Sequence, residues 1–352
     1  MSISKQFFSI CLVSIVAISA NATEKKVKWK MATTWGSAAV PIITASNNVA
    51  EYVKQMSDGQ FTIRVDSANK HKAPMGVFDM TKQGQYQMGH TTSYFWKGKD
   101  INLLPFTTMP FGMTAPERMA WFEFGGGMEL MSKAYEKYGM LSFLGGNTGN
   151  QMGGWFKKEI KTLDDLKGLR MRIPGFAGEI MSKLGVAVTN IPPGELYTSL
   201  DRGTIDALEW VGPGMDIKMG FHKVAPYYYT GWHEPGAEAQ FLVNKKAFDK
   251  LSNKNKSILK NAMRLAAYRM YIEFYHMNSN AWNKMKTDYP HIKVKTFPKE
   301  IMDRLKSINK ELVEKYSHKS EFFRKIVESQ KAYMKKSREW TKISDLDYIQ
   351  DK

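Results

Sequence analysis

Hydrophobic and polar residues follow two different periods in the first part of the chain. Residues 27–35 alternate apolar side chains with lysines, which is the period-two pattern of a half-buried strand. Residues 47–59 carry apolar side chains at helical spacing and end in glycine, and residues 61–66 return to the strand pattern. Strands that alternate with helices indicate βαβ units and a mainly parallel sheet, so the pattern predicts an α/β fold.

A second set of such units follows the glycine-rich stretch at 145–154. The patterns predict a helix at 163–168, a strand at 169–173, a helix at 178–185, a strand at 186–191, a helix at 194–203 and a strand at 205–211. We interpret these units as a second lobe. The chain is expected to cross between the lobes near 145–150 and to return near 230–240.

Residues 252–288 contain neither glycine nor proline, and their apolar side chains recur at helical spacing. Ser252 is a suitable N-cap and Pro290 a suitable stop, which predicts one helix on the order of 50 Å long at about 1.5 Å per residue. A helix of this length exceeds the width of one lobe and is expected to span both. Residues 299–342, rich in lysine and glutamate, predict a second helical zone.

The N-terminus has the features of an export signal. Lys5 precedes an apolar stretch from Phe7 to Ala20, and small residues follow up to Ala22. The stretch is short for a membrane span, which needs about 20 apolar residues, although an uncleaved anchor is the alternative. Cleavage after Ala22 predicts a periplasmic protein. It would also remove Cys11, the only cysteine, which excludes disulfides and cysteine catalysis from the mature protein.

The chain carries a formal net charge of +17. Its lysines are scattered over predicted helix faces and no zinc-finger or RNA-recognition pattern occurs, so we expect no nucleic-acid partner and interpret the charge as a solvated surface. A basic protein that binds anionic polymers or membranes is an alternative. The sequence also lacks the G-x-S-x-G elbow, the serine β-lactamase set and the kinase motifs, which argues against an enzyme.

Arg170 and Arg172 share one face of the predicted strand at 169–173. Arg172 lies at the carboxyl end of this strand, which is where open α/β sheets bind ligands. An arginine there can hold a carboxylate through two parallel hydrogen bonds, which lysine cannot imitate. The alternative is a solvated or structural ion pair.

Three further residues are candidates for polar chemistry. Glu209 lies in the apolar run DALEWVGP, where it is either exposed on a strand or buried and paired. Glu234 lies in the loop GWHEPG, and Gln151 follows the glycines of GGNTGNQMGG. The loop glutamate is more often solvated and the glycines more often serve a turn. Neither signal identifies a site alone.

Aromatic residues end two predicted strands in the first lobe, in TTWG (33–36) and SYFWKG (93–98). These side chains either line a cleft or pack in the core, and their pattern does not decide between the two.

Several long stretches closely resemble the substrate-binding receptors of TRAP transporters, most of all the branch that binds 2-oxo acids such as pyruvate. The stretches are QMGGWFKKEIKTLDDLKGLRMRI, KLGVAVTNIPPGELYTSLDRGTIDALEWVGP and GFHKVAPYYYTGW. Similarity extends from about Val27 to about Trp340, which is nearly the whole mature chain.

The resemblance implies a two-lobe periplasmic binding protein fold, with a cleft between the lobes and a long helix spanning both. The expected divisions are a signal at 1–22, lobe I at 23–147 with about 234–275, lobe II at 148–233 with part of 276–300, and a C-terminal helical segment at 300–352. The resemblance further implies periplasmic export and delivery of the ligand to a membrane permease driven by a sodium gradient.

The resemblance also implies the site. It places the arginine that holds the ligand carboxylate on Arg172. It places the ligands of a bridging sodium or calcium ion, with sodium slightly preferred, on Gln151, Glu209, Trp210 through its backbone carbonyl, and Glu234. Gln151, Glu209 and Trp210 also contact the substrate in this scheme, and Trp35, Tyr94 or Trp96 cap it. This all-oxygen ligand set suits a hard cation.

We therefore predict a receptor, not an enzyme, that binds a small 2-oxo or 2-hydroxy monocarboxylate of the pyruvate or lactate type. The alternative is a secreted metal-dependent hydrolase that uses Glu209 and Glu234 with a metal-activated water. In related receptors the C-terminal helix can exchange between subunits and form a dimer. Residues 320–345 are expected either to form a homodimer in this way or to pack back on their own lobe.

Overall fold

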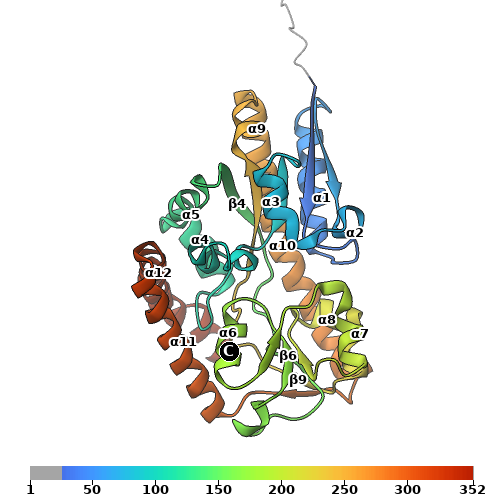
Figure 1. Ribbon diagram of the computed structural model, residues 1–352, viewed down its shortest axis with the longest axis vertical. Coiled ribbons are helices and arrows are strands. Elements are labelled where there is room, and N and C mark those ends of the chain that lie inside the picture. The colour runs from blue at the N-terminus through green and yellow to red at the C-terminus, as the bar shows by residue number, and fades with distance from the viewer. Residues whose placement is uncertain (1–25, 352) are drawn as a thin grey trace, which may run out of the picture.

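The computed structural model describes residues 26–351 (Figure 1). The predicted export signal at 1–22 lies outside the described residues. Two β-sheets form the centres of two lobes, lobe I at the top of Figure 1 and lobe II at the bottom. Between residues 26 and 351, no helix is both long and apolar enough to cross a membrane.

Lobe I contains a five-stranded sheet in the order β2-β1-β3-β10-β4. Its strands are β1 (Val27–Thr33), β2 (Phe61–Asp66), β3 (Met88–Thr91), β4 (Met140–Asn147) and β10 (Glu238–Asn244). β1 is parallel to β2 and β3, whereas β10 is antiparallel to β3 and β4. Since β10 joins this sheet only after the chain has formed β5 to β9 of the second one, lobe I consists of separate segments.

Lobe II contains a six-stranded sheet in the order β11-β9-β5-β8-β6-β7. Its strands are β5 (Gly154–Phe156), β6 (Arg170–Arg172), β7 (Ala187–Thr189), β8 (Ala207–Leu208), β9 (Tyr227–Tyr229) and β11 (Lys293–Lys295). β6 is parallel to β8, with Arg172 opposite Leu208. The carboxyl ends of these two strands therefore lie side by side, and the residues that follow them enter the same region.

Helices surround both sheets. In chain order they are α1 (Ile42–Met56), α2 (Ala68–His71), α3 (Val77–Lys82), α4 (Ala115–Phe124), α5 (Gly127–Glu136), α6 (Gly175–Lys183), α7 (Leu196–Asp201), α8 (Pro213–Met219), α9 (Lys245–Asp249), α10 (Asn253–Asp288), α11 (Lys299–Lys319), α12 (Glu321–Ile343) and α13 (Asp345–Asp351). The 3-10 segments are η1 (Pro74–Gly76), η2 (Ser93–Trp96), η3 (Ile101–Phe106), η4 (Asp164–Leu166), η5 (Pro193–Glu195) and η6 (Phe221–Lys223).

The predicted long helix is confirmed as α10, which runs through both lobes (Figure 1). The Ser252 side chain caps it by accepting a hydrogen bond from the Asn255 amide at 3.2 Å. α10 contacts α1 and β4 in lobe I and α8 in lobe II. One continuous apolar core, which includes Phe241 of lobe I, Trp155 of lobe II and Phe274 of α10, lies beneath it. The helix thus joins the two lobes through a shared core.

The predicted C-terminal helical zone forms α11 and α12, which pack on different lobes. α11 contacts α6 of lobe II, and α12 contacts η3, α4 and α5 of lobe I. α12 buries Phe323, Ile326 and Val327, and Arg338 near its end donates to Glu117 of α4 at 2.9 Å. In the single chain, residues 320–343 therefore pack on their own lobe.

Three local predictions are wrong. Residues 163–168 contain only the 3-10 turn η4, because Lys167 is already extended and Gly168 has a positive φ, which ends the helical backbone after one turn. The strand at 205–211 is only two residues long, since Glu209 and Trp210 leave the sheet. Residues 93–96 form a 3-10 segment rather than a strand end.

Candidate functional site

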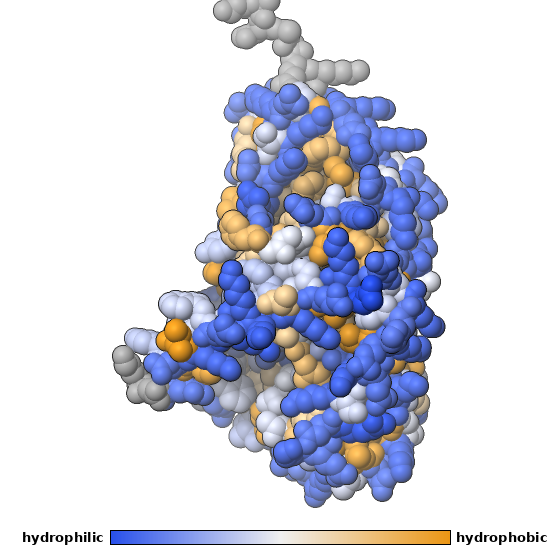
Figure 2. Space-filling model, turned by 90° about the vertical axis from the view of Figure 1, so that its left-hand side faces the viewer, coloured by the Kyte–Doolittle hydropathy of each residue, from blue (hydrophilic) through white to orange (hydrophobic). Residues whose placement is uncertain are grey.

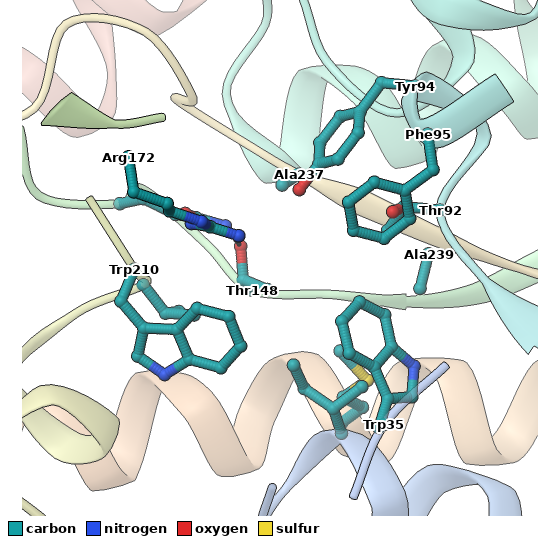
Figure 3. Close-up of a pocket in the computed structure, with 13 residues that line it drawn as sticks. Trp35, Thr92, Tyr94, Phe95, Thr148, Arg172, Trp210, Ala237 and Ala239 are labelled. Atoms are coloured by element: carbon teal, nitrogen blue, oxygen red, sulfur yellow. Dashed lines mark hydrogen bonds between the residues drawn. The ribbon is translucent and has the colours of Figure 1, made fainter. Parts of the chain in front are cut away.

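A cavity lies between the two lobes beside α10 (Figure 3). Its lining residues are Trp35, Ile42, Thr92, Tyr94, Phe95, Thr148, Gln151, Arg172, Trp210, Val211, Ala237, Ala239 and Met270. Figure 3 shows Arg172 and Trp210 on one side, facing Tyr94, Phe95 and Thr92 on the other. Arg172 is the one charged side chain in this lining. The cavity therefore suits a small, mostly apolar anion.

Arg172 is held at the end of β6 by the strand that lies beside it. Its side chain is 3 % exposed, and one guanidinium nitrogen, Nη1, donates to the Glu209 carbonyl at 2.6 Å. The same nitrogen lies 3.4 Å from a Glu209 carboxylate oxygen, and the guanidinium lies 5.5 Å from the centre of the Trp210 ring. Arg170 instead forms an exposed ion pair with Asp206 at 2.6 Å. The two arginines on one strand thus have separate roles, and only Arg172 faces the cavity.

Glu209 and Glu234 are both buried, at 1 % and 2 % exposure. Within residues 26–351, Glu209 Oε1 and Glu234 Oε2 have no hydrogen-bond partner. Burial raises the pKa of Glu209 to about 8, against the opposing effect of Arg172. Burial and the nearby Glu209 carboxylate raise the pKa of Glu234 to about 8 as well. A pair of buried acids with free oxygens is unfavourable alone and indicates a positively charged partner.

Gln151 is tied to the loop that carries Glu234. Its backbone amide donates to the Glu234 carbonyl at 2.9 Å, and its side-chain amide donates to Thr148 Oγ1 at 2.9 Å. This bond uses the Gln151 nitrogen, which leaves its oxygen for another partner. A Cβ on Gly231 would lie 1.8 Å from the Gln151 carbonyl oxygen, so this close approach requires glycine. The glycine at 231 therefore brings the two segments together.

The oxygen atoms near Arg172 fit a hard cation. Two carboxylates, one side-chain amide and the Trp210 backbone carbonyl are oxygen donors of the kind that sodium and calcium prefer. In the described part of the chain there is no group of three or more His, Cys, Asp or Glu side chains that could hold a metal ion. A set with only two carboxylates does not need such a group, since an amide and a carbonyl complete it.

His233 was not among the predicted site residues, yet it is fully buried beside Glu209. Its Nε2 lies 3.4 Å from Glu209 Oε1. Burial lowers the pKa of His233 to about 4, so the imidazole is neutral near pH 7. It therefore adds no positive charge to balance the acids.

The aromatic candidates separate into two groups. Trp35 and Tyr94 line the cavity, and Figure 3 shows the Tyr94 hydroxyl pointing toward it. Trp96 does not line it: its ring packs 5.4 Å from Phe78 in the core of lobe I. Phe95 lies in the cavity instead. In a strand, alternate residues share a face, whereas the 3-10 segment η2 turns the adjacent residues 94 and 95 toward the cavity.

Comparison with known proteins shows the family of this chain. The family model for bacterial extracellular solute-binding protein, family 7, matches residues 31–319. The chain belongs to this family. It is 39 % identical over 331 residues to a monocarboxylate 2-oxoacid-binding periplasmic protein of a Nostoc species, covering 94 % of this chain and 90 % of that protein.

Two crystal structures of TRAP periplasmic solute-binding proteins are also similar. One from Colwellia psychrerythraea, with bound calcium and pyruvate, is 55 % identical with a TM-score of 0.91 and covers 93 % of this chain and 100 % of its own. One from Pseudoalteromonas atlantica, with bound sodium and pyruvate, is 57 % identical with a TM-score of 0.90 and covers 92 % and 99 %. These similarities confirm the two-lobe fold and the assignment as a receptor of TRAP type.

A family 7 solute-binding protein is a substrate-binding receptor of a transporter, not an enzyme. The alternative function, a metal-dependent hydrolase that uses Glu209 and Glu234, is therefore not supported. A role in ligand binding is the function that remains for these two acids.

Proposed function

We propose that this receptor binds a small 2-oxo or 2-hydroxy monocarboxylate, of the pyruvate or lactate type, together with a bridging sodium or calcium ion. One observation carries the proposal: buried Arg172 lies beside the buried Glu209, whose charge acts on the buried Glu234, and each acid has one oxygen without a hydrogen-bond partner in the described chain. An arginine can hold a ligand carboxylate, and a cation can join the free protein oxygens to the ligand. The bound ligands of the Colwellia and Pseudoalteromonas proteins support this pairing.

Each side chain has a defined part in this scheme. Arg172 holds the carboxylate of the ligand, and the Tyr94 hydroxyl and Trp35 ring cover it from lobe I. The cation would be held by Gln151, Glu209, the Trp210 carbonyl and Glu234, and when bound it supplies the positive charge that the two acids lack. The 2-oxo or 2-hydroxy oxygen gives the ligand a second donor beside its carboxylate.

The net charge of the buried site depends on which of the two cations is bound. Arg172 contributes one positive charge, the ionised Glu209 and Glu234 contribute two negative charges, and the ligand adds a third. A sodium ion leaves this buried group with one net negative charge, whereas a calcium ion leaves it neutral. Since burying net charge is costly, calcium balances the site more completely.

The ligand contacts side chains from both lobes, because Arg172 and Trp210 come from lobe II and Trp35 and Tyr94 come from lobe I. It therefore stabilises the form in which the lobes are closed and shifts the population toward it. In this proposal the N-terminal signal directs the protein to the periplasm, where the closed form delivers its ligand to the membrane permease subunits.

Thermal denaturation of refolded protein tests the ligand class. Pyruvate and lactate, with calcium or sodium present, are expected to raise the melting temperature on the order of 5 °C at 100-fold excess over Kd, whereas propionate should give little rise. Propionate has the same chain length but lacks the second oxygen that the cation needs. An equal rise with propionate would remove the bridging cation from the scheme.

We also propose that two copies associate through the C-terminal end of the chain. Trp340, Ile343 and Ile349 are 67 %, 73 % and 75 % exposed, and this end stands out from the body in Figure 2, with hydrophobic surface on it. A chain that ends after Glu339 keeps the buried contacts of α12. It is expected to run as a monomer in light scattering while the full chain runs as a dimer. The same mass for both would contradict this proposal.

A further inference from the structure

Asp216 has a set of contacts that the scheme above does not explain. It lies on α8 and is 1 % exposed. Its Oδ1 accepts the backbone amides of Val211 and Gly212 at 3.2 and 3.0 Å. Its Oδ2 accepts the Trp155 indole N–H at 3.0 Å and the Tyr228 hydroxyl at 2.8 Å. One buried carboxylate thus serves four donors.

These four donors connect the sheet of lobe II to the segment that follows β8. Trp155 on β5 and Tyr228 on β9 are fully buried, and their rings stack with centres 4.0 Å apart. The pair forms a rigid base within the sheet. From this base, Asp216 reaches the two residues that link Trp210 to α8.

The bond between Asp216 and the Val211 amide affects the Trp210 carbonyl, which is one of the proposed cation ligands. The Val211 N–H and the Trp210 C=O belong to the same peptide unit, which is planar and trans, so the two groups point in opposite directions. When Asp216 holds the Val211 N–H, it also fixes the direction of the Trp210 carbonyl. The Val211 carbonyl is fixed separately, since it accepts the Met152 amide at 2.9 Å.

We infer that Asp216 is a positioning residue: its Oδ1 holds the Val211 amide and thereby aims the Trp210 carbonyl at the cation. The inference rests on the proposed function, because it concerns an atom of the proposed cation site. Asp216 itself touches neither the cation nor the ligand. Its contribution is the preorganisation of one cation ligand, so it acts on the affinity for the cation.

Two variants separate positioning from general support of the fold. Asp216→Ala removes the acceptor for the Val211 amide, whereas Tyr228→Phe removes one donor to Asp216 and leaves the Val211 bond intact. Both are expected to lower the melting temperature, because each breaks a buried hydrogen bond. The distinguishing readout is the calcium concentration that gives half-maximal pyruvate binding, measured by calorimetry on refolded protein, with sodium titrated in a parallel series.

Asp216→Ala is expected to raise this concentration at least tenfold, while Tyr228→Phe stays within about twofold of the wild type. If Asp216→Ala does not fold, Asp216→Asn is measured instead. Its single oxygen cannot serve all four donors, and we expect a rise of about threefold. A wild-type midpoint in the folded Asp216 variant, or an equal shift in Tyr228→Phe, overturns the positioning role. Pyruvate binding by the wild type without any cation would overturn the proposed function itself.

Discussion

Replacing Arg172 with alanine is expected to abolish the rise in melting temperature that pyruvate gives. The side chain is buried, and it is the one charged group in the cavity lining. Removing one partner of a buried charge pair costs about 2–5 kcal/mol, which corresponds to a loss of affinity on the order of 30-fold to more than 1,000-fold. Arg172→Lys keeps the charge but loses the planar two-bond grip, so we expect it to lose most of the affinity too.

Arg170→Ala is the matched control. Arg170 lies two residues away on the same strand, but its side chain is half exposed and pairs with Asp206. An exposed ion pair is worth about 0–1 kcal/mol, so this variant should keep the full response to pyruvate. A full response in Arg172→Ala would contradict the carboxylate role of Arg172.

The second large effect is expected for Glu234→Gln, which keeps the shape of the side chain and removes its charge. Without cation, the variant should be more stable than the wild type above about pH 8, because it no longer buries a second acid beside Glu209. With calcium and pyruvate the order should reverse, because one charged cation ligand is lost. Melting temperatures of both proteins, with and without calcium and pyruvate, measure the two effects.

The pH dependence of this effect has a definite sign. The folded-state pKa of Glu234 is raised to about 8, above the ordinary value of 4.5. The folded protein holds the Glu234 proton more tightly than the unfolded chain does. This proton therefore stabilises the fold at pH values below the ordinary pKa of 4.5, and the stabilisation is lost as the pH rises to the folded-state pKa of about 8. The cation-free wild type should therefore lose stability between about pH 4.5 and pH 8, and Glu234→Gln should lose less of it. Identical pH profiles for the two proteins would argue against a buried, unpaired Glu234.

The sequence predicted the features that depend on long patterns or on chain direction. The helix at 252–288 could be predicted because a long, uninterrupted helical period that begins at a serine cap is typical of one continuous helix. The structure has this helix at Asn253–Asp288. Arg172 was a candidate because the carboxyl end of a strand is where such sheets bind ligands. The structure places it in the cavity lining.

Features that depend on tertiary contacts could not be predicted in this way. Trp96, one of the three capping candidates, packs in the core and Phe95 lines the cavity, because residues 93–96 form a 3-10 segment, in which the alternation of a strand does not apply. The strand at 205–211 ends early because Glu209 and Trp210 turn toward Arg172, a partner that is distant in sequence. Asp216 gave no signal at all, since its four donors come from three separate segments.

Glu209 and Glu234 show the limit most clearly. Each could be identified as an unusual acid in an apolar or glycine-rich stretch, but nothing in the spacing indicates that both are buried near one arginine. That arrangement depends on Gly231, which lets the loop of Glu234 approach the Gln151 backbone. Only the folded chain shows that both glutamates are buried, that Glu209 lies beside Arg172, and that each has one oxygen without a hydrogen-bond partner among the described residues.

The most direct test of the central claim is calorimetry of pyruvate binding. The protein is first unfolded to release carried-over ligand, treated with a chelator to remove metal, and refolded. Titrations are made in potassium buffer alone, with added sodium chloride, and with added calcium chloride. We expect binding to be weak in potassium buffer and at least tenfold tighter with calcium or sodium. Equal affinity in all three buffers would contradict a ligand that is held jointly by Arg172 and a bridging cation.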